Sequence, residues 1–388
     1  MLFCKKIYIA LILCSFCLFA CQIQNKIEDD FVTEEFTCDE FTQEKVVDYA
    51  FVPLETSEAS LLGQVVKVEK DGDCLFVLHK IGDELSIYEF DTNGRFVAQI
   101  GAKGRANNEY LSICDFVVDR TNKRIVILDP YLRVLAYDYS GKHLSTIKIA
   151  NPEMNSIIPF VKDSEVLPDG RLVLWLMPNY NTTNLVCVVD ASFEQMEVLA
   201  QCALPVKVGA YSFMNAPLTV DVDKILALVP MATKLLIWGN DGECKEIVLS
   251  QEINANLAKL GSQHSTYEDY HNAALMSFYS DCTRGVYISS DLRVVSTPGG
   301  FYLLDEDLTH ASFVTNESTE GSVSSLTISS SDIVAVSENS IITLPNSAFW
   351  NNLPEIVNNN PELVESTLSY APDFERGDNP VLVIYNLK

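Results

Sequence analysis

Sequence motifs of the common enzyme classes are missing from this chain. It contains no Gly-x-Ser-x-Gly nucleophile elbow, no Gly-x-x-x-x-Gly-Lys-Ser/Thr phosphate loop and no His-Glu-x-x-His zinc-protease motif. Cys-x-x-Cys pairs are absent as well, which argues against structural zinc and thiol redox chemistry. We therefore expect a non-catalytic protein. An enzyme that gathers single residues from several parts of its fold stays open as the alternative.

Basic residues are few. The chain has 27 Lys and Arg against 53 Asp and Glu, which gives a formal net charge of -26 at pH 7. A protein this acidic repels the phosphates of nucleic acids and anionic lipid headgroups. Nucleic-acid binding is therefore excluded.

A hydrophobic run long enough to span a membrane is also lacking. The longest apolar stretch runs from Ile7 to Ala20, after Lys5 and Lys6, and a spanning helix needs about 20 residues. A basic start, a short apolar region and a small last residue are typical of a signal peptide. We predict that residues 1–20 are this signal; a short membrane anchor is the alternative.

The junction Leu18-Phe19-Ala20-Cys21 resembles the lipobox of bacterial lipoproteins, although Phe19 is bulkier than usual. The resemblance implies that Cys21 becomes the first residue and carries lipid, and two acyl chains suffice for stable anchoring to a membrane. Residues 21–45 would be the lipidated tether. The acidic stretch Glu28–Asp30 resembles the surface-export signal of Bacteroidetes lipoproteins, so we expect the outer-membrane surface, with the periplasmic face as the alternative.

The remaining cysteines do not predict a disulfide framework. Seven follow Cys21, an odd number, widely spaced and mostly within apolar patterns. We interpret them as small core residues. They are Cys38, Cys74, Cys114, Cys187, Cys202, Cys244 and Cys282.

Short β-rich runs separated by turn residues dominate the chain from residue 60 onward. The stretch 64–101 contains four such runs, which is the size of one propeller blade. A turn phrase of the form Asp-x-x-Gly ends at Gly94 and Gly141 and returns in weaker form at Phe193 and Gly242, giving spacings of 47, 52 and 49 residues. This repeat predicts an all-β, six-bladed β-propeller; five or seven blades are the alternatives.

The ends of the chain provide strands that could close the ring. A β-run at 46–54 precedes the first unit, and another occupies 379–388. Pairing them in the last blade would protect exposed sheet edges, with either run outermost. Polar insertions at 251–272 and 348–369 predict short helical additions. We place the propeller domain at residues 46–388.

Three segments resemble landmarks of the six-bladed β-propeller lipoproteins of Bacteroidetes, distant relatives of NHL-repeat propellers. They are Val52–Thr56, Ile100–Tyr110 and Asp378–Val383. The family's second landmark reads Gly-x-Gly-Pro-Gly-Glu-Tyr, and Ala106–Asn108 replaces its Gly-Pro-Gly centre here. The resemblance implies an architecture and a location. It implies no activity and no catalytic residue.

Two groups of residues are candidates for ligand binding. On the connection between the first two blades, Arg105 could clamp a carboxylate or sugar hydroxyls and Tyr110 could offer a stacking face. The structural alternative is that Glu109 and Tyr110 pin the inter-blade turn.

The second group lies on the expected inner strands: Lys67, Asp115, Glu165 and Asp221. Converging carboxylates could perform acid/base chemistry or hold Ca²⁺, the one metal ion that we consider; otherwise we expect no cofactor. The alternative is that these residues simply line a solvated channel.

We predict a surface lipoprotein that binds a glycan, a peptide or an envelope protein without catalysis. One alternative is a hydrolase or lyase with carboxylates at the channel mouth. Another is a scaffold subunit of an envelope complex, whose mark would be a large apolar patch. The fold does not decide between them.

Overall fold

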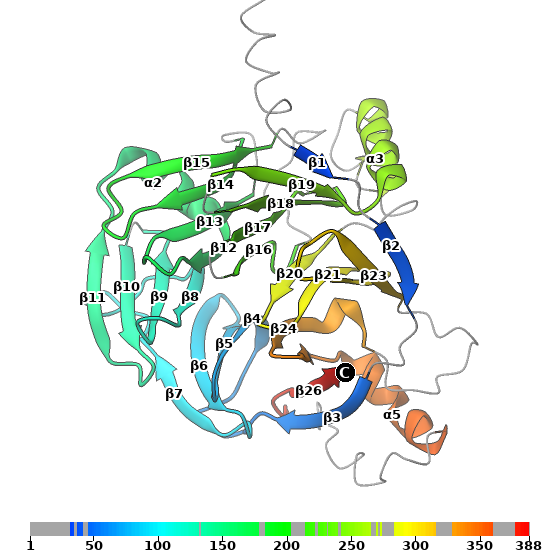
Figure 1. Cartoon of the computed structure of the whole chain (residues 1–388). Helices are drawn as coiled ribbons and strands as arrows, with labels where there is room; N and C mark the ends of the chain where they lie inside the picture. Colours follow the sequence, from blue (N-terminus) through cyan, green and yellow to red (C-terminus); the bar gives the residue numbers. More distant parts are fainter. Residues whose placement is uncertain are drawn as a thin grey trace, which may run out of the picture.

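Six β-sheets surround a central axis in the computed structural model, as the blades of a propeller (Figure 1). The expected six-bladed fold is therefore confirmed. The structure describes residues 32–34, 37–41, 46–131, 133–177, 183–202, 214–221, 224–230, 232–239, 242–264, 269–270, 272–273, 283–315, 328–359 and 377–387. The predicted signal peptide and Cys21 lie outside these residues.

The blades are numbered in chain order, and each begins with its inner strand. Blade 1 contains β4 (Gln64–Asp71), β5 (Cys74–Ile81), β6 (Glu84–Asp91) and β7 (Phe96–Ile100). Blade 2 contains β8 (Asp115–Asp119), β9 (Arg124–Asp129), β10 (Arg133–Asp138) and β11 (His143–Lys148). Blade 3 contains β12 (Val161–Val166), β13 (Leu172–Leu176), β14 (Asn184–Val189) and β15 (Met196–Gln201). Blade 4 contains β16 (Leu218–Asp221), β17 (Lys224–Leu228), β18 (Lys234–Trp238) and β19 (Cys244–Val248). Blade 5 contains β20 (Gly285–Ile288), β21 (Arg293–Thr297), β22 (Gly300–Leu304) and β23 (His310–Thr315).

Blade 6 closes the ring with strands from both ends of the chain. It contains β24 (Ile333–Ser337), β25 (Ser340–Thr343), β26 (Val381–Leu387) and, outermost, β3 (Val46–Pro53). β3 pairs antiparallel with β26 along its length. The N-terminal run is therefore the outer strand, and the terminal run lies one position further in.

The N-terminal segment also extends two other blades. β1 (Val32–Glu34) pairs in parallel with β19 on the rim of blade 4, and β2 (Thr37–Phe41) pairs in parallel with β23 on the rim of blade 5. Both strands fall within the residues that we interpret as a tether. The chain therefore follows the rim of three successive blades before it enters blade 1.

One turn recurs between the third and fourth strands of the blades. In blade 1, the Asp91 carboxylate accepts hydrogen bonds from the backbone N–H groups of Asn93 and Arg95, and Gly94 has φ +80°. Phe193 occupies the same turn position in blade 3 with φ +58°, although only glycine adopts this region without steric cost. The hydrogen bonds of the Asp carboxylate hold the turn even where the glycine is lost.

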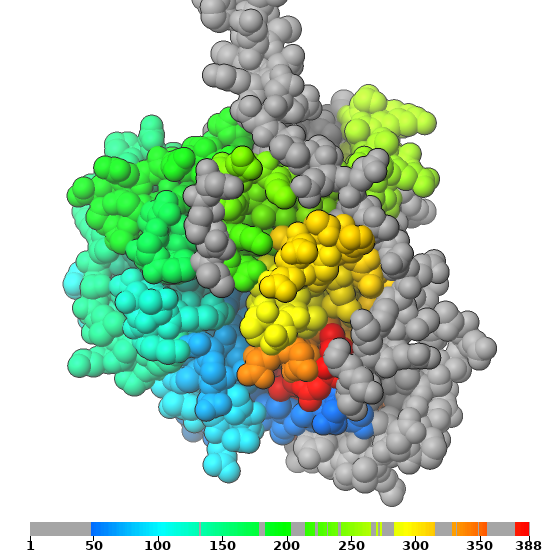
Figure 2. Space-filling view, in the orientation of Figure 1, coloured from blue at the N-terminus to red at the C-terminus, as the bar shows by residue number. Residues whose placement is uncertain are grey.

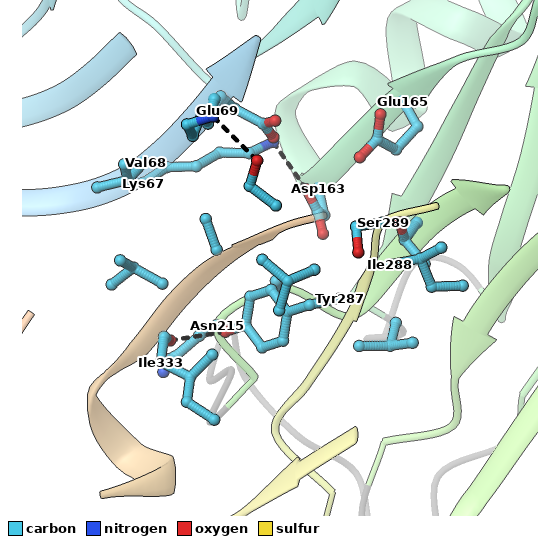
Figure 3. A pocket seen from close by; sticks show the side chains of 18 of the residues that line it. Lys67, Val68, Glu69, Asp163, Glu165, Asn215, Tyr287, Ile288, Ser289 and Ile333 are labelled. Atoms are coloured by element: carbon cyan, nitrogen blue, oxygen red, sulfur yellow. Dashed lines mark hydrogen bonds and ion pairs between the residues drawn. The ribbon is translucent and has the colours of Figure 1, made fainter. Parts of the chain in front are cut away.

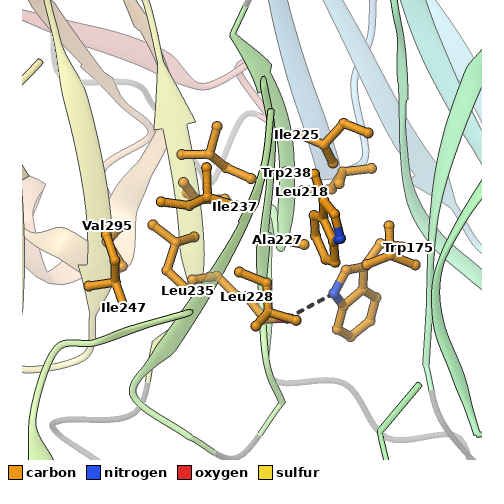
Figure 4. Packing of buried hydrophobic residues seen from close by; sticks show 14 of the residues in the cluster. Trp175, Leu218, Ile225, Ala227, Leu228, Leu235, Ile237, Trp238, Ile247 and Val295 are labelled. Carbon is orange, nitrogen blue, oxygen red and sulfur yellow. Dashed lines mark hydrogen bonds between the residues drawn. The ribbon is translucent and has the colours of Figure 1, made fainter. Parts of the chain in front are cut away.

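The core fills the spaces between neighbouring blades, and the blades appear as successive sectors of colour in Figure 2. The largest cluster joins blades 3, 4 and 5. In it, the buried Trp175 of β13 donates a 2.9 Å hydrogen bond from its indole N–H to the Leu228 carbonyl of β17 (Figure 4). Because this bond gives the indole N–H a partner, the ring can be buried between two blades without leaving a donor unpaired.

Two short helices lie at the predicted insertions, α3 (Gln251–Gln263) and α5 (Ser347–Asn359). A third, α2 (Pro152–Ile157), precedes blade 3 and was not predicted from the sequence. Within the described residues, none of the helices combines the length and the apolar character needed to span a bilayer.

Candidate functional site

A cavity of about 540 Å³ occupies the centre of the ring. Its walls come mainly from the inner strands (Figure 3). Arg120, from the turn after β8, also lines it. Successive side chains of a strand point to opposite faces, so alternate residues of each inner strand face the channel. This pattern places Lys67 and Glu69 of β4 opposite Asp163 and Glu165 of β12.

Lys67 occupies the centre of a buried ion-pair network. Its Nζ lies 2.9 Å from Asp163 Oδ1, 3.2 Å from Asp115 Oδ2 and 3.5 Å from Glu69 Oε1. The carboxylates of Asp115 and Asp163 are only 3% and 2% exposed. One ammonium from blade 1 therefore compensates two buried carboxylates, one from blade 2 and one from blade 3.

Further contacts complete this network. Asp115 Oδ2 accepts a 2.5 Å hydrogen bond from the Ser164 hydroxyl, and Asp163 Oδ2 accepts a 3.1 Å bond from the Leu218 N–H of blade 4. Lys67 Nζ also donates to the Phe116 carbonyl and lies 5.5 Å from the centre of the Phe116 ring. The network thus connects four of the six blades at the axis.

Burial and charge act against each other on these groups. Burial raises the pKa of Asp115 to about 6, although the neighbouring Lys67 opposes the increase. Burial also raises the pKa of Asp163, again against Lys67. For Lys67 itself, burial would lower the pKa, but the surrounding carboxylates outweigh it and the pKa is raised well above its ordinary value. Lys67 is therefore a permanent cation.

A second set of charges lies toward the ends of the inner strands. Arg120 donates a 2.9 Å hydrogen bond to Glu69 Oε2, and Arg293 donates a 3.1 Å bond to Asp221 Oδ2. Glu165 differs from these acids, because its carboxyl has no hydrogen bond or ion pair within the described residues. Burial raises the pKa of Glu165 to about 8, and the Glu69 carboxylate adds to the increase.

The structure brings the predicted inner-strand residues together. Lys67, Glu165 and Asp221 line the cavity. Asp115 does not line it but forms an ion pair with Lys67. The sequence-based selection missed Asp163, Glu69 and Arg120. For two of them the sequence holds a signal, because side chains two positions apart on a strand point to the same face. Glu69 is two positions from Lys67 on β4, and Asp163 is two positions from Glu165 on β12.

The predicted residues between blades 1 and 2 form a separate turn. Glu109 Oε2 accepts a 2.9 Å hydrogen bond from the Ala106 N–H, and a Cβ on Gly104 would lie 1.8 Å from that oxygen. The Tyr110 ring is wholly buried, so it presents no stacking face, and its hydroxyl donates to the Leu85 carbonyl. Arg105 is exposed and does not line the cavity. Glu109 and Tyr110 therefore hold the inter-blade turn.

A metal site does not emerge from the described part of the chain, where no three His, Cys, Asp or Glu side chains are arranged to hold an ion. The cysteines Cys74, Cys114, Cys187, Cys202 and Cys244 are free thiols. Burial raises the pKa of Cys187 to about 12, so this thiol stays protonated and unreactive at neutral pH.

Comparison with known proteins gives a family and two similar structures. The sequence profile of the family described as "Domain of unknown function (DUF4934)" matches residues 42–386. A crystal structure of a protein named as exported, from Bacteroides fragilis NCTC 9343, has a TM-score of 0.63 with 16% identity, over 92% of this chain and 99% of that one. A DUF4221-family structure from Bacteroides vulgatus ATCC 8482 has a TM-score of 0.53 with 10% identity, over 88% and 97%. No curated protein matches the sequence.

Proposed function

The chain belongs to this family of unknown function, and we propose that it is an exported, non-catalytic binding module that holds a polar ligand in its central channel. The observation that carries the proposal is the cavity itself. It lies at the axis, where the inner strands present charged side chains to a space large enough for a small ligand or the end of a longer one. Ligands of this kind include the ends of glycans and peptides.

The state of the charges favours binding over catalysis. Glu69, Asp163 and Asp221 each form an ion pair with a basic partner, so these carboxylates are fixed in position and already have a counter-charge. A hydrolase or lyase is the second candidate, and Glu165 supports it. A carboxyl with a pKa of about 8 is protonated at neutral pH and suits a general acid.

Blocking the channel tests the binding proposal. Ser337 lines the cavity at the end of β24 and is partly exposed, so Ser337→Trp should fill the mouth without disturbing the core. We expect this variant of the full-length protein to lose at least tenfold in affinity for any glycan or peptide that the wild type binds in an array. Ser145→Trp, on the exposed face of β11, is the matched control. Equal binding by the wild type and both variants would mean that the ligand binds outside the channel. Hydrolysis or cleavage of a bound glycan would favour the alternative function, a hydrolase or lyase.

The proposed location is the outer-membrane surface, through lipid on Cys21. The lipobox-like junction supports it, and the structural neighbour from B. fragilis is itself named as exported. We expect Cys21→Ala to move the protein from the membrane fraction to the soluble fraction, because the apolar stretch before it is too short to anchor the chain alone. Cys17→Ala, within the predicted signal, should leave the fractionation unchanged. A Cys21→Ala protein that stays with the membrane would contradict lipid anchoring.

A further inference from the structure

We propose that the ligand held in the channel carries a primary ammonium group and that this group binds beside Glu165. This inference rests on the proposed binding function and names the class of ligand. Four features of the cavity lead to it: its charge balance, the unpaired Glu165, the way the cavity already holds one ammonium group, and the lack of an exposed aromatic surface.

The cavity has more acidic than basic residues in its walls. Seven lining residues are acidic and three are basic. The acidic residues are Glu69, Asp71, Asp163, Glu165, Asp221, Asp332 and Glu338, and the basic residues are Lys67, Lys70 and Arg120. Walls of protein focus the field of such charges into the channel. Even with Lys123 and Arg293, which pair with Asp71 and Asp221, the acids outnumber the cations when Glu165 is ionised, so the channel then favours a cationic ligand over an anionic one.

Glu165 is the unpaired acid of the inner strands. Among the lining acids, Glu69, Asp71, Asp163 and Asp221 each have a basic partner within 4.0 Å, and the partners of Asp71 and Asp221 are Lys123 and Arg293, which lie outside the cavity wall. Glu165 has neither such a partner nor a hydrogen bond among the described residues, although it is mostly buried and faces the cavity (Figure 3). Arg120 and Lys67 act on this carboxyl electrostatically, but neither lies within ion-pair distance of it, so an ionised Glu165 has room for a cation in direct contact.

Lys67 shows how these walls bind an ammonium group. Its Nζ is held by the carboxylates of Asp115 and Asp163, by the Phe116 carbonyl and by the face of the Phe116 ring. These are the groups that recognise ammonium ions in general. The same channel leaves Glu165 available, and the Glu69 carboxylate of β4 acts on it across the channel.

Neutral sugars fit the cavity less well. Sugar sites commonly present an aromatic face, and the lining residues described by the structure include one aromatic residue, Tyr287. Tyr287 is only 7% exposed, and its hydroxyl donates a 2.9 Å hydrogen bond to the Ile333 carbonyl. Its ring is thus committed to packing between blades 5 and 6.

Capture of a cation by Glu165 is coupled to release of a proton. The groups that face Glu165 are Glu69 and Lys67 from β4, Arg120 from the turn after β8 and Asp163 from β12, with Asp221 of β16 also in the wall. Because the pKa of Glu165 is raised to about 8, its carboxyl is neutral at pH 6 and must ionise to pair with an ammonium. The affinity should therefore rise with pH, by up to about tenfold per unit below pH 8.

Calorimetric titration of the full-length protein with 1,5-diaminopentane tests the proposal. The neutral probe 1,5-pentanediol has the same length and should not bind. We expect the diamine to bind with an affinity that increases between pH 6 and pH 8, and with release of close to one proton per ligand at pH 7, measured in buffers of different ionisation enthalpy. Glu165→Gln should weaken binding at pH 8 at least tenfold. Glu197→Gln removes the same charge from exposed β15 of the same blade and should change nothing.

Several results would overturn the inference. These are equal binding of the diol, wild-type affinity in Glu165→Gln, or no diamine binding at pH 8. If glycans or peptides without an ammonium group still lose affinity in Ser337→Trp, the channel function stands and only the ligand class is wrong. If Ser337→Trp affects the binding of no ligand, both the channel function and the proposed ligand class are wrong. Thermal melting of Glu165→Gln shows whether it is folded, and Glu165→Asp, which keeps the charge, should retain part of the affinity.

Discussion

Replacing Lys67 with methionine is expected to lower the free energy of unfolding by about 3–5 kcal/mol, the usual cost of removing one partner from a buried ion pair. Methionine keeps the length of the side chain but leaves the carboxylates of Asp115 and Asp163 without their cation. Both are almost completely buried, so water cannot replace the lost partner. Urea unfolding followed by circular dichroism measures the change.

The loss should depend on pH in a defined direction. Without Lys67, the folded-state pKa values of Asp115 and Asp163 rise further above their unfolded values. A carboxyl whose pKa is raised on folding costs stability as the pH rises, because the folded state must then give up a proton that it holds tightly. The stability that Lys67→Met loses relative to the wild type should therefore be larger at pH 8 than at pH 5. A deficit that is independent of pH would mean that lost packing, not charge, is responsible.

Two further variants identify the source of the effect. Adding Asp115→Asn and Asp163→Asn to Lys67→Met removes the uncompensated charges and should recover part of the lost stability. Lys123→Met removes the exposed partner of Asp71 and should cost at most about 1 kcal/mol. If Lys67→Met costs no more than Lys123→Met, the network at the axis is not a main determinant of stability.

The fold could be predicted from the sequence because its signals are local. The turns at Gly94, Gly141, Phe193 and Gly242 depend on residues adjacent in sequence, and all four have positive φ in the structure. The order of strands in blade 6 could not be predicted, because β3 and β26 are separated by more than 300 residues and both read as plain β-runs. Pairing between such distant strands leaves no mark in either one.

The candidate site was predictable only in part, for the same reason. Alternation along a strand shows that Lys67 and Glu165 face the channel, but it does not show which charge lies opposite which. The pairing of Lys67 with Asp163 depends on how blades 1 and 3 are placed around the axis. In the loop with Arg105, the sequence does not show that the Glu109 carboxylate accepts a hydrogen bond from the turn backbone, because that contact depends on the folded shape of the loop.

The side chain of Asn379 connects the two sequence landmarks at the ends of the propeller, Val52–Thr56 and Asp378–Val383. The side chain of Asn379 accepts a 2.7 Å hydrogen bond from the Leu62 N–H and donates bonds of 2.6 Å and 2.8 Å to the carbonyls of Glu55 and Ser60. It is only 2% exposed. One amide thus ties the segment before β26 to the connection between β3 and β4, where the ring closes.

Asn379→Ala should cost at least about 2 kcal/mol, because it leaves the Leu62 N–H and the Ser60 carbonyl without partners in a largely buried place, each at about 1–3 kcal/mol, whereas the Glu55 carbonyl keeps its bond from the Ser60 hydroxyl. Asn339→Ala, which removes one bond to the Leu387 carbonyl at the other end of β26, should cost about 1 kcal/mol. Asn379→Asp keeps the shape but turns a carboxylate oxygen toward two carbonyls, so it should be less stable at pH 8 than at pH 5, where protonation restores a donor. Calorimetric melting gives the stabilities, and hydrogen exchange should show β3 and β26 opening first. Similar losses for Asn379→Ala and Asn339→Ala would mean that the closure depends on strand pairing alone.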